Sequence, residues 1–197
     1  KALFADPDVP RVLDPEALSQ VFTFWTTITP KTAFHNIFEL PPGHFMYVRN
    51  SGATRPKPFW TLPCQSKEDR YQGSFDEAKQ ELAGLLEDAI RLRLRADVPV
   101  GAYLSGGLDS SIITSLIAKK FNNRLRTFSL TFQESPFDES AWQNELVQAL
   151  GTDHSEISVA NQDVRDNLAQ VIWQCEKPLL RTGPVPLFSL SKLVRDN

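Results

Sequence analysis

Between Ser74 and Glu176 the chain alternates β-like runs with helical patterns. Three short runs predict strands, and they cover residues 98–104, 126–132 and 154–159. The helical patterns that flank and separate them cover residues 74–94, 110–121, 139–150 and 164–176. A strand, a helix and a second strand in this order favour parallel strands in one sheet, with helices on its faces. We therefore predict an α/β fold built on part of a doubly wound parallel sheet.

Several of these helices carry end signals in the sequence. Ser74 and Glu77 have the spacing of a capping box, in which each residue's side chain accepts a hydrogen bond from the other's backbone N–H. Gly151 follows the third helix, because glycine readily takes the left-handed conformation at a helix C-terminus. Pro178 ends the fourth helix, and a last helical pattern covers residues 186–195.

The first sixty residues follow a different pattern, with eight prolines and short extended segments. A helix is predicted at residues 15–26, and extended segments are predicted at residues 36–40 and 44–49. The turn Pro41-Pro42-Gly43 joins the two extended segments. This part is therefore predicted to be a small β-rich piece.

The two patterns are separated by a polar stretch, PCQSKEDRYQG, which indicates a linker. We predict one domain over residues 1–62, a linker over residues 63–73 and a second domain over residues 74–197.

Composition and charge argue against several classes of function. The chain has 21 Lys and Arg against 24 Asp and Glu, so it lacks the basic surface that nucleic acids or anionic membranes require. No apolar run is long enough to span a membrane, and the N-terminus lacks a signal-peptide pattern. Cys64 and Cys175 have no metal-ligand spacing, and His35, His44 and His154 lie far apart. We expect a soluble cytoplasmic protein that acts on small molecules.

Three side chains are expected in the core: Trp142, Trp173 and Cys175, the last because free cysteine is usually buried. Asp138 and Glu139 either approach a bound metal ion or start a helix.

The segment Ser105–Ser111, SGGLDSS, lies between the first predicted strand and the helix that follows it. Gly106 and Gly107 have no Cβ, so consecutive backbone N–H groups can turn inward towards an anion. The helix N-terminus adds unpaired N–H groups, and three serines add hydroxyl donors: Ser105, Ser110 and Ser111. The segment has no Walker A lysine. We predict a pyrophosphate site in which Asp109 supplies the oxygen ligand that Mg²⁺ prefers; the alternative is an ordinary glycine turn with Asp109 or Ser110 as the helix cap.

This loop resembles the PP-loop of the glutamine-hydrolysing asparagine synthetases, which are N-type ATP pyrophosphatases with an adenine nucleotide alpha hydrolase-like fold. Other motifs of that family follow in order, at residues 137–140 (FDES), 151–156 (GTDHSE), 176–178 (EKP) and 184–197. Upstream, three segments resemble the closing strands of its Ntn-type glutaminase domain, which ends at Phe59-Trp60: residues 1–5, 34–37 and 40–44. The resemblance covers nearly the whole chain.

The resemblance implies a two-step reaction. ATP activates aspartate as an acyl-adenylate with release of pyrophosphate, and ammonia from glutamine then gives asparagine. It implies that one set of residues binds pyrophosphate and Mg²⁺: Ser105, Gly106, Gly107, Asp109, Ser110 and Ser111. It also implies that Tyr103 and Leu130 flank the adenine through main-chain atoms, and that the protein is a homodimer.

Departures from the family pattern suggest a fragment. The family's cysteine nucleophile is matched by neither Cys64 nor Cys175, and its second ATP-site loop would follow Asn197. We expect this polypeptide alone to be catalytically silent and to bind nucleotide weakly at most.

Three other functions remain open. A relative such as a β-lactam synthetase or an antibiotic-modifying amidotransferase would share SGGLDSS and differ in its acyl substrate. A regulatory module would bind ATP or AMP without turnover. A purely structural role is disfavoured, because core packing does not require three serines and an aspartate around a Gly-Gly turn.

Overall fold

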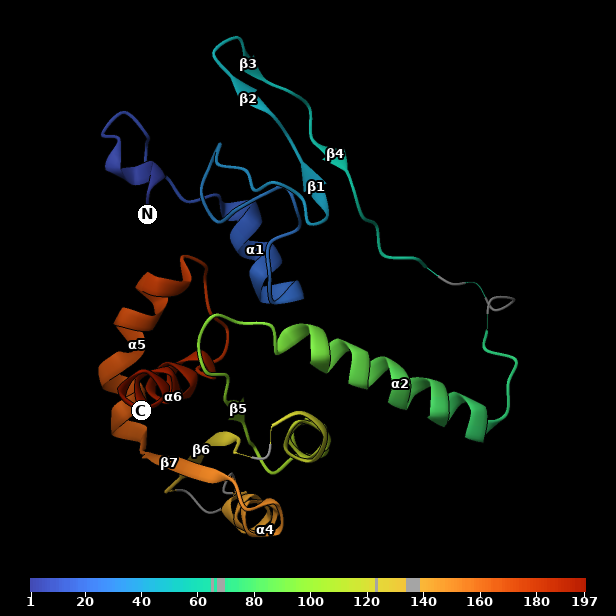
Figure 1. The fold of residues 1–197 in the computed structure, drawn as a ribbon. Helices are drawn as coiled ribbons and strands as arrows, with labels where there is room; N and C mark the ends of the chain where they lie inside the picture. The colour runs from blue at the N-terminus through green and yellow to red at the C-terminus, as the bar shows by residue number, and fades with distance from the viewer. Residues whose placement is uncertain (65, 67–69, 123, 134–138) are drawn as a thin grey trace. The chain divides into compact units, whose positions relative to one another are not determined.

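The computed structural model describes residues 1–64, 66, 70–122, 124–133 and 139–197 (Figure 1). Contacts divide the chain into two units. Unit 1 contains Lys1–Arg70 and Ala169–Arg181, and unit 2 contains Tyr71–Leu168 and Thr182–Asn197. The change from the first unit to the second at residues 70 and 71 falls inside the stretch predicted as a linker. The return of residues 169–181 to unit 1 has no signal in the sequence.

Unit 2 is built on a three-stranded parallel sheet in the order β5-β6-β7. The strands are β5 (Ala102–Tyr103), β6 (Arg126–Phe132) and β7 (Asp153–Val159). The parallel α/β arrangement is thus confirmed. Within the described ranges the strand order does not reverse, so the doubly wound character stays a prediction.

Helices alternate with these strands as predicted. They are α2 (Phe75–Arg93), α3 (Leu108–Leu116), which continues as a π-helical turn at Ile117–Phe121, α4 (Ser140–Leu150), α5 (Asn161–Cys175) and α6 (Pro184–Asp196). α6 packs on β6 and β7, and α4 packs on β6. The buried core joins α2, the π-helical turn and the sheet through Ile90, Ala102, Ile117 and Leu125. None of the helices in the part of the chain described above is both long and apolar enough to cross a membrane.

The first predicted strand is much shorter than expected, because only residues 102 and 103 pair with β6. Proline has no N–H to give to a ladder, and Pro99 lies in the predicted run. Val98 is exposed rather than covered on both faces.

The predicted capping box of α2 is confirmed. The backbone N–H of Ser74 donates to Glu77 Oε2 at 2.7 Å, and the N–H of Glu77 donates to Ser74 Oγ at 3.3 Å. We expect Ser74→Ala to lower the free energy of unfolding by about 1 kcal/mol, because an N–H of the first turn loses its acceptor. Urea unfolding measures this effect. Ser74→Asn is the control, because its side-chain oxygen can still accept at the N-cap, and it should keep most of the wild-type stability; equal losses for both variants would contradict the role of the side-chain acceptor.

His154 lies opposite Thr127 in the β6–β7 ladder. Its Nδ1 is 2.9 Å from Thr127 Oγ1, which is also 2.8 Å from Thr152 Oγ1. Its Nε2 is buried and has no partner among the described residues. Burial lowers the pKa of His154, and the nearby Glu156 carboxylate opposes that shift. The folded protein therefore favours the neutral ring.

This preference predicts a loss of stability in acid. Above the ordinary histidine pKa of about 6.5 the ring is neutral in both folded and unfolded chains. As the pH falls below that value the unfolded chain takes up the proton first, so the free energy of unfolding declines. We expect His154→Asn to lose less stability than the wild type between about pH 7.5 and 5.5 in urea unfolding. His35→Asn, at an exposed position, is the control; a pH response of His154→Asn equal to that of the wild type would refute the assignment.

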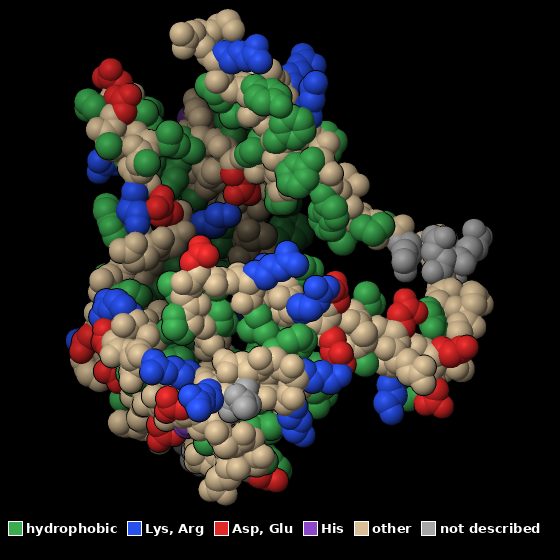
Figure 2. Space-filling model, viewed as in Figure 1, with side chains coloured by type: hydrophobic (Ala, Val, Ile, Leu, Met, Phe, Trp, Pro, Cys, Tyr) green, Lys and Arg blue, Asp and Glu red, His purple; other side chains and the backbone are tan. Residues whose placement is uncertain are grey.

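Unit 1 contains α1 (Pro15–Phe24) and two short antiparallel ribbons. The Asp14 carboxylate caps α1 by accepting from the N–H groups of Glu16 and Ala17 at 2.9 and 3.0 Å. One ribbon pairs β1 (His44–Phe45) with β4 (Lys57–Pro58), and the other pairs β2 (Val48–Arg49) with β3 (Gly52–Ala53). Two-residue strands bury little surface, so several aromatic side chains stay exposed over this part (Figure 2): Phe45, Tyr47, Phe59 and Trp60.

The predicted turn before β1 is confirmed. The N–H of His44 donates to the Pro41 carbonyl at 3.2 Å, and Gly43 has a φ of +69°. A Cβ at Gly43 would lie 2.2 Å from the carbonyl oxygen of Trp60, so this position requires glycine.

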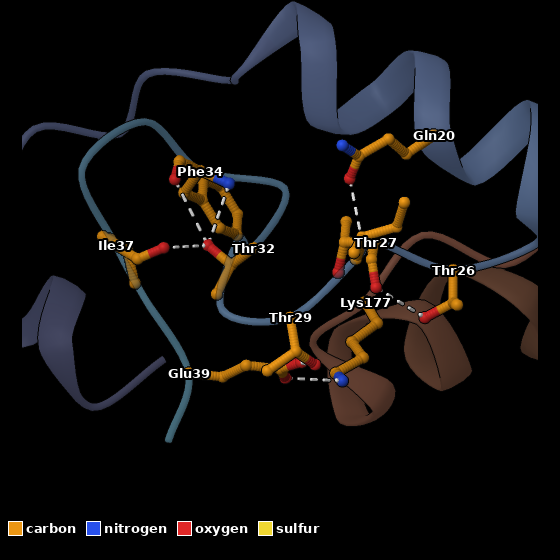
Figure 3. Close-up of polar contacts among 10 residues, drawn as sticks. Gln20, Thr26, Thr27, Thr29, Thr32, Phe34, Ile37, Glu39 and Lys177 are labelled. Carbon is orange, nitrogen blue, oxygen red and sulfur yellow. Dashed lines mark hydrogen bonds and ion pairs between the residues drawn. The ribbon is translucent and has the colours of Figure 1, made fainter. Parts of the chain in front are cut away.

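The extended segment predicted at residues 36–40 is wrong. Asn36 has a φ of +60°, and the Thr32 hydroxyl donates to the Ile37 carbonyl at 2.7 Å (Figure 3). The same hydroxyl accepts from the N–H of Phe34 at 3.1 Å. These local side-chain bonds favour a turn over a strand, and only Phe38 makes a bridge, with Lys31.

The prediction that three side chains lie in the core is also wrong. Trp142 and Trp173 are 66% and 64% exposed, and Cys175 is exposed. Each lies on a helix, where the face that packs depends on distant neighbours rather than on the residue's own hydrophobicity.

Candidate functional site

The predicted phosphate loop lies where β5 gives way to α3. After Tyr103, the buried Leu104 still donates its N–H to the Phe128 carbonyl of β6 at 2.9 Å. The chain then turns through residues 105–107 and enters α3, whose N-cap is Gly107. Among the described residues, no side chain caps α3. The N–H groups of its first turn have no intrahelical acceptor, as in any α-helix, and here no capping side chain takes their place at the carboxyl end of the strand.

The three serines of the loop shape the loop itself. Ser105 Oγ lies 2.9 Å from Ser110 Oγ and accepts from the Gly107 N–H at 3.3 Å. The hydroxyls of Ser110 and Ser111 both donate to the Gly107 carbonyl, at 3.0 and 2.8 Å. The structure thus brings the serines together, and their hydroxyls make hydrogen bonds within the loop.

Gly106 is the position where the loop requires glycine. Its φ is +83°, and a Cβ there would lie 3.1 Å from the Glu139 carbonyl oxygen and 3.3 Å from Gln143 Cγ. Gly107 has an ordinary φ of −71°, and a Cβ there would meet only Ser105 Oγ, at 3.4 Å. The first glycine is thus needed for the turn and for close packing of α4, whereas the second is needed only if a ligand comes close.

Asp109 is exposed in the first turn of α3 and, in the described part of the chain, makes no hydrogen bond or ion pair. The described residues contain no cluster of three or more metal-binding side chains. Mg²⁺ in nucleotide sites commonly uses one or two carboxylates together with substrate phosphates. An exposed carboxylate beside the predicted phosphate loop fits that requirement. Asp138 lies outside the described residues, and Glu139 is the N-cap residue of α4.

Tyr103 and Leu130 lie on neighbouring strands at this edge of the sheet. Tyr103 is 51% exposed and Leu130 is half-buried. The sequence did not point to Gln143, which links the two strand ends: its Nε2 donates to the carbonyls of Ser105 and Leu130 at 3.3 and 3.0 Å. Nothing in the sequence marks this residue, because a glutamine in the run AWQNE is expected on an exposed helix face.

Unit 1 contains a separate cavity of about 720 Å³. Its lining is mostly apolar and includes Leu13, Phe34 and Trp173. At its edge Lys177 Nζ lies 3.0 Å from Glu39 Oε2, and the Thr29 hydroxyl donates to Glu39 Oε1 at 2.9 Å (Figure 3). The Lys177 ammonium lowers the pKa of the Glu39 carboxyl. The lining holds a second ion pair, between the Lys1 amino group and Glu176. A mostly apolar cavity whose charged groups are paired in this way does not suit a triphosphate, so the loop in unit 2 stays the candidate nucleotide site.

Comparison with known proteins finds two family matches, one before and one after the change of unit at residues 70 and 71. The family model for asparagine synthase matches residues 81–197, which contain the whole loop and sheet of unit 2. The model for a glutamine amidotransferase domain matches residues 1–60.

Curated relatives match most of this chain. "Asparagine synthetase [glutamine-hydrolyzing] 1" and "3" of Bacillus subtilis are each 30% identical, over 91% and 90% of the chain and 28% and 31% of their own lengths. "Amidase chyE" of Penicillium rubens is 30% identical over 77% of the chain and 25% of its own length. The chain thus spans about a quarter to a third of the length of these relatives. Because the asparagine synthase model covers more than half of it, the chain belongs to the asparagine synthase family.

Proposed function

We propose that this chain is the nucleotide-binding part of an amide-forming ligase. In the proposed reaction, ATP adenylates the side-chain carboxylate of aspartate with release of pyrophosphate, and ammonia from glutamine then displaces AMP to give asparagine. The observation that carries the proposal is the uncapped helix N-terminus behind a positive-φ glycine turn, at the carboxyl end of a parallel strand. This loop lies within the residues matched by the asparagine synthase model.

The loop suits the first step. Cleavage between the α and β phosphates puts developing charge on the leaving pyrophosphate, and backbone N–H groups that are already oriented stabilise it without rearrangement. Gly106 and Gly107 would let the phosphates approach the backbone, and the serine hydroxyls would hold the loop in shape. Mg²⁺, held by Asp109 and by the phosphates, would supply positive charge. The main chain at Tyr103 and Leu130 would flank the adenine.

The domain assignment belongs to the same proposal. We assign residues 1–62 to the end of an Ntn-type glutaminase domain, residues 63–73 to a linker and residues 74–197 to the start of the synthetase domain. The two family matches and the change of unit at residues 70 and 71 support it. A cytoplasmic homodimer that uses ATP, aspartate and glutamine or ammonia would follow from the resemblance.

A second candidate is a ligase of this family with another carboxylic acid substrate. Relatives with another name leave room for it: "Amidase chyE" and "Amidase chry2" match this chain at 30% and 29% identity, much as the synthetases do, so similarity alone does not determine the acyl substrate. Both candidates need the same loop, and they differ only in the acyl pocket.

The test is pyrophosphate release from ATP by the full-length protein that contains this chain. We expect release that depends on aspartate and yields asparagine with either ammonia or glutamine. Release that depends on a different carboxylic acid would favour the second candidate. ATP binding without any release would favour a binding module and overturn the proposed reaction.

A further inference from the structure

The last pairs of the β5–β6 ladder are made by side chains rather than by backbone alone. Backbone pairing ends with Tyr103 opposite Phe128. At the next pair in register, Leu104 opposite Ser129, the buried Ser129 hydroxyl donates to the Leu104 carbonyl at 2.5 Å. Beyond Leu104 the first strand turns away into the phosphate loop, so a further backbone pair cannot form.

Gln143 bridges the following pair in the same register, Ser105 opposite Leu130. Its Nε2 lies 3.3 Å from the Ser105 carbonyl oxygen and 3.0 Å from the Leu130 carbonyl oxygen. Gln143 is 3% exposed and is the buried residue of α4. One amide group from a helix therefore holds together two strand ends that diverge at the site.

The orientation of this amide is determined by its partners. Rotating the group by 180° would place Oε1 against two carbonyl oxygens, so the NH₂ must face them. Oε1 is consequently left buried, with no partner in the described ranges. An apolar side chain of the same length would fill the same space without an unpaired acceptor, so packing alone does not account for a glutamine here.

Gln143 also packs against the turn of the loop. The position that a Cβ would take on Gly106 is 3.3 Å from Gln143 Cγ, so the helix packs directly against the turn. Gln143 thus contacts the turn of the loop and also binds the carbonyls of Ser105 and Leu130, which lie where the two chain segments separate.

We propose that Gln143 is a positioning residue for nucleotide binding. It sets the separation between the Ser105 and Leu130 carbonyls, and with it the position of the phosphate loop relative to the adenine-flanking strand. The inference rests on the proposed nucleotide site and extends it to a residue on α4. Because Oε1 and Nε2 are both enclosed, Gln143 acts through the backbone of the loop and not by contact with ATP.

The experiment measures ATP and pyrophosphate binding to the full-length protein by titration calorimetry, and the KM for the carboxylic acid substrate by a coupled pyrophosphate assay. Gln143→Met keeps the length of the side chain and removes both hydrogen bonds. We expect its Kd for ATP to rise about 10-fold, with the KM for the carboxylic acid substrate changed less than about two-fold. Gln148→Met is the matched control, because Gln148 is an exposed glutamine on the same helix, and its Kd for ATP should match that of the wild type.

A second variant separates positioning from simple destabilisation. In Gln143→Glu the ionised carboxylate faces two carbonyl oxygens, and protonation restores one donor. Its ATP affinity should therefore recover as the pH is lowered, whereas that of Gln143→Met should not. A lower melting temperature with an unchanged Kd for ATP in both variants would overturn the proposal. Failure of the wild type itself to bind ATP and pyrophosphate would instead overturn the proposed function on which it rests.

Discussion

Replacing Gly106 by alanine should raise the Kd for ATP of the full-length protein by at least about 10-fold, and it should suppress pyrophosphate release accordingly. The residue has a φ of +83°, which a side chain strongly disfavours. The added Cβ would also lie 3.1 Å from the Glu139 carbonyl oxygen, a backbone atom that cannot move aside cheaply. Either the turn opens or α4 shifts, and both would change the backbone N–H groups of the proposed phosphate site. Calorimetric titration with ATP measures the effect directly.

Gly151→Ala is the matched control for Gly106→Ala. Gly151 has a φ of +63° at the C-terminus of α4, but a Cβ there would meet nothing within 4 Å. A side chain at Gly151 is disfavoured by the positive φ but would meet no neighbouring atom. Gly151→Ala should therefore lower the stability of the protein and keep the ATP affinity of the wild type. A folded Gly106→Ala variant that binds ATP as the wild type does would show that this turn is not the phosphate site.

Features set by neighbouring residues could be predicted from the sequence. The strand expected at residues 126–132 is β6, and the one expected at residues 154–159 is β7 with one more residue. The Ser74–Glu77 capping box and the left-handed Gly151 are also present as predicted. The capping box and the left-handed glycine depend on residues within about one helical turn, and each strand is marked by its own short run of strand-forming residues, so the local sequence contains the information.

The burial of α4 could not be predicted in this way. Trp142 is exposed and its neighbour Gln143 is buried, which reverses the order that hydrophobicity suggests. The partners of Gln143, Ser105 just beyond β5 and Leu130 within β6, lie 38 and 13 residues away in the chain. The surface that contains these two carbonyls determines which face of α4 packs. At this position a buried amide is favoured over an apolar side chain, because it can donate to both carbonyl oxygens.

The grouping of residues 169–181 with unit 1 has the same kind of cause. Lys177 bonds to Glu39, and the Arg181 guanidinium lies 4.0 Å from the centre of the Trp25 ring. These contacts join residues more than a hundred positions apart. A sequence pattern such as EKP marks the segment without showing what it will touch.

Replacing Asp109 by asparagine should lower kcat/KM for pyrophosphate release about 100-fold, with ammonia or with glutamine as the nitrogen source. The variant keeps the shape of the side chain and removes the charge that would hold Mg²⁺. Asp109 is exposed and, among the described residues, bonds to no other group, so the fold does not depend on it. A coupled pyrophosphate assay on the full-length protein, over a range of Mg²⁺ concentrations, measures the loss.

The matched control for Asp109→Asn is Asp76→Asn. Asp76 is the second residue of α2, as Asp109 is of α3, and it is also exposed. Both substitutions remove a negative charge from the first turn of a helix, so both should change the melting temperature by a similar small amount. Only Asp109→Asn should reduce pyrophosphate release, because only that carboxylate lies beside the phosphate loop. Equal release by the two variants would remove Asp109 from the reaction and favour a protein that binds nucleotide without turnover.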